Sequence, residues 1–149
     1  MTTTIPSPEE LQSIFDNILD NPKDLSLRLI YADALEDFGN YPLSTFIRLQ
    51  INRFKEKKVS LSKQEKLILS TWGNYWVALP LYLQQRQLVG DFRISWRWSR
   101  GFIYYLRCPY PIFHMYKDSL LQTYPLECLQ VSSTSTLCGS SFIKEYFNN

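Results

Sequence analysis

The side chains best suited to chemistry are three carboxylates, Asp33, Glu36 and Asp37. Residues three and four positions apart lie on the same face of a helix, so these carboxylates are expected close together. Such a cluster can bind a metal ion or act as general acid and base, which gives an enzyme as one hypothesis. Exposed helix faces, however, commonly carry carboxylates in ordinary ion pairs. We therefore expect Asp33 to pair with Arg28 or Arg48, and Glu36 and Asp37 to be solvated.

The histidine, cysteine and glycine residues favour no catalytic site. His114 is the single histidine, expected on a helix surface, and any usual zinc site or nucleophilic dyad would depend on it alone. Cys108, Cys128 and Cys138 are odd in number and far apart, which predicts buried, reduced thiols in a reducing compartment. The five glycines form no phosphate-binding cluster. We expect no catalytic residue, no metal and no cofactor.

Cations and aromatic side chains make nucleic acid the alternative partner. One group interleaves both types in a strand-like segment, and the other is a basic stretch. The first group is Arg93, Trp96, Arg97, Trp98 and Arg100, and the second is Arg53, Lys55, Lys57, Lys58, Lys63 and Lys66. Strict alternation places both tryptophans on one strand face with Phe92 and Ile94, which is typical of a core. The net charge of +2 is small, so another protein is the preferred partner.

The elements that position these residues begin with four predicted helices. Ser7 with Glu10, and Ser62 with Glu65, have the spacing of capping boxes, and Gly39 supplies a left-handed stop. Apolar residues recur between these signals at helical spacing. The four predicted helices cover residues 8–21, 24–38, 42–54 and 62–75.

After residue 90 the apolar period changes to that of strands. Strands are predicted over Phe92–Trp98, Phe102–Cys108 and Leu126–Val131, a helix over Ile112–Tyr124, a loop over Ser132–Thr136 and a weak helix over Phe142–Phe147. Strand, helix and strand in this order fit a right-handed crossover. We expect an α+β fold with a helical bundle (1–90) packed on a small sheet with a crossover helix (91–149). Trp72, Trp76, Trp96 and Trp98 are expected to join both parts in one core.

Three segments resemble a known family. They are Arg28-Leu29-Ile30-Tyr31-Ala32-Asp33 with the following Leu35-Glu36-Asp37, Phe46-Ile47-Arg48-Leu49-Gln50, and Arg100-Gly101-Phe102. In order and spacing they look like the signature of the bacterial repeat-companion domain, although Ala34 replaces a usual tryptophan, and Asn40 and Thr45 replace usual acids. The resemblance implies a module that accompanies repeats, here running into a leucine-rich-repeat-like segment around Leu126 and Leu129. It implies no reaction.

The hypothesis from these patterns is a non-enzymatic protein-interaction or adaptor module. A strand–helix–strand unit at the start of an array exposes apolar surface and a strand edge, expected near Leu126–Val131. Either Phe142, Ile143, Tyr146 and Phe147 fold back as a cap, or another chain covers this apolar surface. Met1–Pro6 lacks the features of a secretory leader, and no apolar stretch approaches the roughly 20 residues that span a bilayer. We expect a cytoplasmic protein without membrane contact.

Overall fold

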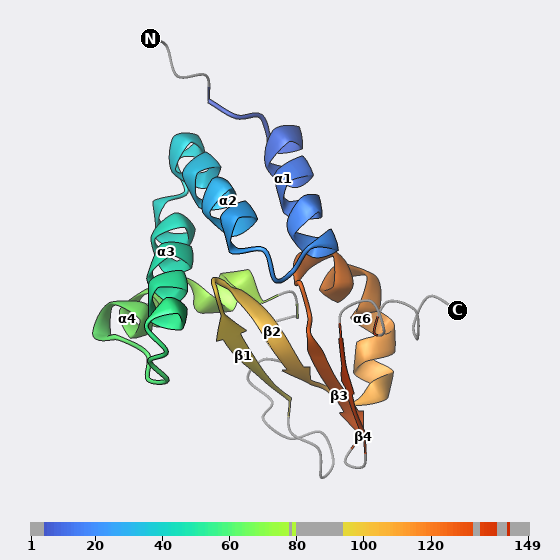
Figure 1. Cartoon of the computed structure of the whole chain (residues 1–149). Helices are drawn as coiled ribbons and strands as arrows, with labels where there is room; N and C mark the ends of the chain where they lie inside the picture. The colour runs from blue at the N-terminus through green and yellow to red at the C-terminus, as the bar shows by residue number, and fades with distance from the viewer. Residues whose placement is uncertain (1–4, 78, 80–93, 133–134, 140–142, 144–149) are drawn as a thin grey trace. The chain divides into compact units, whose positions relative to one another are not determined.

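The computed structural model describes residues 5–77, 79, 94–132, 135–139 and 143 (Figure 1). The chain has an α+β fold, as predicted, in which helices come first and a small mixed sheet follows. The elements are α1 (Pro8–Asp20), α2 (Leu25–Phe38), α3 (Tyr41–Lys55), α4 (Lys63–Trp76), β1 (Ser95–Ser99), β2 (Phe102–Arg107), α6 (Tyr110–Thr123), β3 (Cys128–Ser132) and β4 (Ser135–Cys138).

The chain divides into two compact units. The first comprises Met1–Gly73 and Ser99–Phe102, and the second comprises Asn74–Trp98 and Ile103–Asn149. Each unit contains its own cluster of buried apolar side chains. The predicted boundary at residue 90 lies outside the described residues, and the single shared core remains a prediction.

The predicted signals for the beginnings of helices are confirmed. The hydroxyl of Ser7 accepts a hydrogen bond from the amide of Glu10 (3.2 Å), and that of Ser62 accepts one from the amide of Glu65 (3.1 Å). α2 ends at Gly39 with a φ of +100°, the left-handed conformation that glycine adopts without steric cost. Polar caps and the glycine stop therefore determine where the chain changes direction.

The core of the first unit includes a residue from outside the helices. Phe102, the last residue of the short segment Ser99–Phe102, lies with its ring centroid 5.5 Å from that of Phe15 and 6.0 Å from that of Tyr31. The two central residues of this segment form a hairpin turn, and both have positive φ: Arg100 (+55°) and Gly101 (+94°). Two successive left-handed residues are the geometry of a type I′ turn, whose twist matches that of paired strands.

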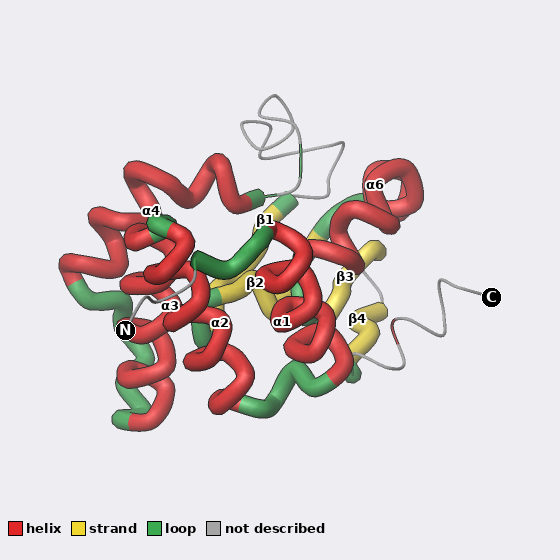
Figure 2. Tube along the Cα trace, turned by 90° about the horizontal axis from the view of Figure 1, so that it is seen from above, coloured by secondary structure: helices red, strands yellow, loops and turns green. Residues whose placement is uncertain are grey.

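In the second unit the four strands lie in the order β1-β2-β3-β4 (Figure 2). β2 and β3 are parallel, with Tyr105 opposite Cys128, and α6 connects them, so the predicted crossover connection is confirmed. β4 pairs antiparallel with β3 and places Cys138 opposite Cys128.

Two predictions about this sheet are wrong. Of the Ser/Thr run predicted as a loop, 132–136, Ser132 ends β3, and Ser135 and Thr136 begin β4, because pairing with β3 stabilises these residues as a strand. β3 is also not an edge strand, since it pairs with β2 on one side and β4 on the other. The predicted helix Phe142–Phe147 lies outside the described residues except for Ile143, which is buried.

The hairpin turn predicts an unequal effect of two alanine substitutions. A Cβ atom at Gly101 would lie 2.5 Å from Ile47 Cγ1 and 3.0 Å from Ile47 Cα, in addition to the strain of positive φ. Gly101→Ala should therefore lower the free energy of unfolding by about 3 kcal/mol or more. Gly39→Ala is the matched control, since its φ is similar but nothing lies within 4 Å, and it should cost only about 1 kcal/mol. Urea denaturation followed by circular dichroism measures both, and equal losses would contradict the role given to Ile47.

Candidate functional site

Two carboxylates of the cluster on α2 share one arginine of α3. Arg48 donates hydrogen bonds to Asp33 and, over 2.7 Å, to Glu36. Both hydrogen bonds raise the pKa of the Arg48 guanidinium above its ordinary value, and the hydrogen bond to Asp33 contributes more than the one to Glu36. The predicted ion pair of Asp33 with Arg48 is confirmed. Glu36 and Asp37 are exposed, as predicted, and Glu36 in addition pairs with Arg48. Among the described residues no three His, Cys, Asp or Glu side chains are grouped so that they could hold a metal ion.

Arg28 is fully buried and does not pair with Asp33. Its guanidinium donates hydrogen bonds to the backbone carbonyls of Ser99 (3.2 Å), Arg100 (3.0 Å) and Pro22, and it lies 5.4 Å from the centroid of the Phe102 ring. A buried charge is tolerated only when polar groups replace its hydration. Carbonyl dipoles and an aromatic face replace the water around Arg28. Its hydrogen bonds hold the backbone of the hairpin turn in place, and we call a residue with this role a clamp.

Gln50 of α3 is the second clamp on the same turn. Its side-chain oxygen accepts a hydrogen bond of 2.8 Å from the amide of Gly101, and both residues are buried. Arg100 lies with its guanidinium 5.0 Å from the centroid of the Phe54 ring. The three segments that carry the family resemblance therefore meet at one turn, and their polar residues stabilise its backbone conformation.

Arg28 and Gln50 were not predicted as core residues, although their spacing from apolar residues places them on the buried faces of their helices. Arg28 precedes the buried residues Ala32 and Leu35 by four and seven positions, which places it on the buried face of α2. Gln50 likewise follows the buried Ile47 by three positions. A polar residue at a core position of an amphipathic helix indicates a buried hydrogen bond.

The residues predicted to bind a partner do not form one surface. Trp96 and Trp98 are half-buried and pack against the core of the second unit, while the exposed Arg97 lies 4.9 Å from the ring centroid of Tyr105. Three others are buried: Arg100, Leu126 and Leu129. Leu126 and Leu129 were expected on an exposed edge, but the pairing of β4 with β3 makes that strand internal. Arg93, Phe142, Tyr146 and Phe147 lie outside the described residues.

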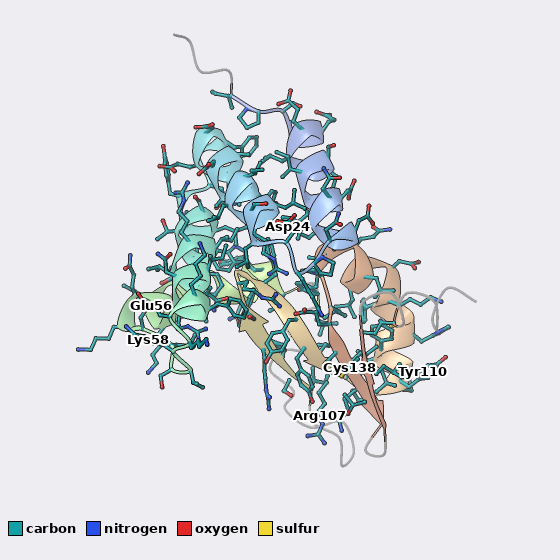
Figure 3. The ribbon with its side chains drawn as sticks, viewed as in Figure 1. Asp24, Glu56, Lys58, Arg107, Tyr110 and Cys138 are labelled. Atoms are coloured by element: carbon teal, nitrogen blue, oxygen red, sulfur yellow. The ribbon has the colours of Figure 1, made fainter. Side chains whose placement is uncertain are left out.

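A different surface gathers exposed cations and apolar side chains, and we call it the basic corner. It comprises the end of α3, the connection and the beginning of α4, with the exposed residues Lys55, Lys57, Lys58, Val59, Lys63, Lys66 and Leu67. Val59 is 92% exposed and Leu67 is 67% exposed. Glu56 and Lys58, which form an ion pair of 2.9 Å, mark this corner in Figure 3.

A buried ion pair gives the basic corner its shape. Arg53 donates from Nε to both carboxylate oxygens of Glu65 (2.9 and 3.1 Å), and from Nη1 to the carbonyls of Lys58 and Val59 (both 3.1 Å). Glu65 is only 1% exposed, so its charge is neutralised internally. The connection between the helices is thus fixed from within, and its lysines remain on the outside.

Comparisons of the chain with protein-family models, with curated proteins and with solved structures find no match. The resemblance to the repeat-companion domain remains a prediction. Within the described ranges, no helix combines the length and the apolar character needed to cross a membrane.

The two arginine environments predict losses of different size in the free energy of unfolding. Arg28→Met should lower the free energy of unfolding by about 2–4 kcal/mol, because the carbonyls of Ser99 and Arg100 lose their buried donor. Asp33→Asn should cost at most about 1 kcal/mol, because the Asp33 side chain is 72% exposed and Arg48 keeps Glu36 as a partner. Denaturant unfolding of both variants is the measurement. A larger loss in Asp33→Asn than in Arg28→Met would refute the assignment of the clamp.

Proposed function

We propose that the protein is a non-enzymatic protein-interaction module that binds an acidic surface of another protein through the basic corner. The observation that carries the proposal is the combination of exposed lysines with exposed Val59 and Leu67 along the end of α3, the connection and the beginning of α4. Protein interfaces commonly surround an apolar centre with a polar rim, and opposite charge on the partner orients the encounter.

Internal order of the corner supports a binding role. Arg53 and Glu65 fix the connection before any partner arrives, so little conformational entropy is lost when the backbone is bound. Glu65 pairs with Arg53, and within the part of the chain that the structure describes, Glu56 is the only carboxylate that pairs with a lysine of this corner, Lys58. The corner therefore keeps a positive potential that favours an acidic partner.

The arrangement of aromatic side chains favours protein over nucleic acid. Binding of single strands uses exposed aromatic faces on which bases stack. Trp96 and Trp98 instead pack against the core, and Arg97 lies over Tyr105. The most exposed apolar residues of the basic corner, Val59 and Leu67, are aliphatic, which suits side chains of a protein better than bases. Nucleic acid remains an outcome of the test below.

The absence of enzymatic activity is part of the same proposal. Asp33 and Glu36, the carboxylates best suited to acid–base work, share the guanidinium of Arg48. The polar groups of Arg28 and Gln50 hold backbone groups of the hairpin turn. These interactions give all of these side chains a structural role, and a module that accompanies repeats, as the resemblance implies, needs none of them for catalysis.

Reversal of two charges in the basic corner should weaken the binding of the partner. Immobilised protein is used to capture partners from a cell extract treated with nuclease, and the captured protein is purified for titration calorimetry. Lys63→Glu with Lys66→Glu should weaken its binding at least about tenfold, because rim charges of the wrong sign repel an acidic partner.

The control is Lys23→Glu with Lys117→Glu, which changes the net charge equally at other positions and should bind like the unmodified protein. Thermal unfolding of both variants verifies that they are folded. Loss of capture on nuclease treatment would replace the protein partner by nucleic acid. Equal weakening in both variants would show that the corner is not the binding surface.

A further inference from the structure

Two cysteines far apart in the sequence face each other in the sheet. Cys128 of β3 and Cys138 of β4 are register partners in the antiparallel pair, and their sulfur atoms lie 2.6 Å apart. The prediction of buried thiols is confirmed for Cys108, whereas Cys128 is only partly buried and Cys138 is exposed. Figure 3 labels Cys138 on β4.

The hydrogen bonds beside this pair show which type of antiparallel position it occupies. The amide of Gly139 donates to the carbonyl of Glu127 over 2.6 Å, so the bond joins the residue after Cys138 to the residue before Cys128. That pattern makes the cysteines a non-hydrogen-bonded pair, whose Cα atoms are typically about 4.5 Å apart. Disulfides form readily at Cα separations of about 4.4–6.8 Å, so the backbone needs no rearrangement.

The three cysteines differ in their access to reagents. Burial raises the pKa of Cys108 to about 12, and its side chain has no exposed surface, which keeps it a thiol. Burial, and then the hydrogen bond with Cys138, raise the pKa of Cys128 to about 11. Cys138 is the sulfur that a dissolved oxidant meets first, and Cys128 is in position to resolve the product.

We propose that Cys128 and Cys138 form a reversible oxidation site whose oxidant is a low-molecular-weight disulfide of the glutathione type. The Cys138 thiolate attacks one sulfur of oxidised glutathione, the sulfur–sulfur bond of the oxidant breaks, and one glutathione leaves. Cys128 then loses its proton and attacks the Cys138 sulfur, which displaces the second glutathione. Two protein thiols are oxidised to one disulfide, one oxidised glutathione is reduced to two thiols, and the two protons released go to the departing glutathione molecules.

The disulfide would connect β4 covalently to β3. In the reduced protein the described residues of β4 are held by backbone pairing and by the packing of Leu137 against the core of the second unit. A link that closes this short loop restricts the unfolded chain, so the oxidised protein should be more stable than the reduced one. The site thus makes the stability of the second unit depend on the redox potential of the surroundings.

The test is equilibration of the whole protein in buffers of graded glutathione ratio, followed by acid quenching, alkylation and mass spectrometry. We expect an oxidised monomer that is lighter by two hydrogens. Its digest should contain one disulfide that joins the peptides of Cys128 and Cys138, and an alkylated Cys108. The midpoint of thermal unfolding should rise by about 5 °C or more on oxidation. Cys108→Ala, the control, should form the same link.

The proposal is overturned by any of three results in the unmodified protein. These are three free thiols in fully oxidised glutathione, a stable mixed disulfide at Cys138, and disulfide-linked dimers in place of the internal link. Cys138→Ser should lose both the internal link and the rise in unfolding temperature. Because thiol counting in the unmodified protein does not depend on the variants, a poorly folded variant leaves the test decisive.

Discussion

The first unit depends on the burial of one positive charge, that of Arg28. Its side chain has no exposed surface, and its described hydrogen bonds go to backbone carbonyls, two of them in the turn more than 70 positions later in the chain. Removing such a charge from water is costly unless those carbonyls are in place. The helices Pro8–Lys55 therefore reach their final packing only together with Ser99–Phe102. This unit is discontinuous in sequence, so a fragment that ends before the turn lacks both the acceptors of Arg28 and the ring of Phe102.

Polar side chains have two distinct uses in the first unit. Those inside it, such as Arg28, Gln50 and Glu65, pair with specific backbone groups or with the guanidinium of Arg53, and they fix the geometry of the turn and the basic corner. The lysines of the basic corner instead lie exposed to solvent. This separation explains why a signature of conspicuous charged residues need not indicate catalysis. The signature residues with buried charges maintain the shape of the unit, and the exposed lysines that support our proposed interaction lie outside the signature.

The sequence predicted the helices well because their signals are local. Caps such as Ser7 and Ser62, the stop at Gly39 and apolar residues at helical spacing need no distant contact to be recognised. The partners of Arg28 and the pairing of Cys128 with Cys138 depend on long-range contacts, which one sequence does not reveal. β4 was missed because its hydroxyl-rich composition is typical of loops, and only its pairing with β3 stabilises it as a strand. A partner-binding surface was predicted on the strand with two tryptophans, but their side chains are half-buried and pack against the core of the second unit.

The direction of β4 also limits how the sheet can grow. Arrays of parallel strand–helix repeats lengthen when each new strand pairs with the free side of the previous one. β3 begins such a series, since it is parallel to β2 across α6. β4 occupies the next position in the opposite direction, and its backbone uses the donors and acceptors that a further parallel strand of the series would require. A further parallel strand therefore cannot pair with β3 on this side without displacing β4.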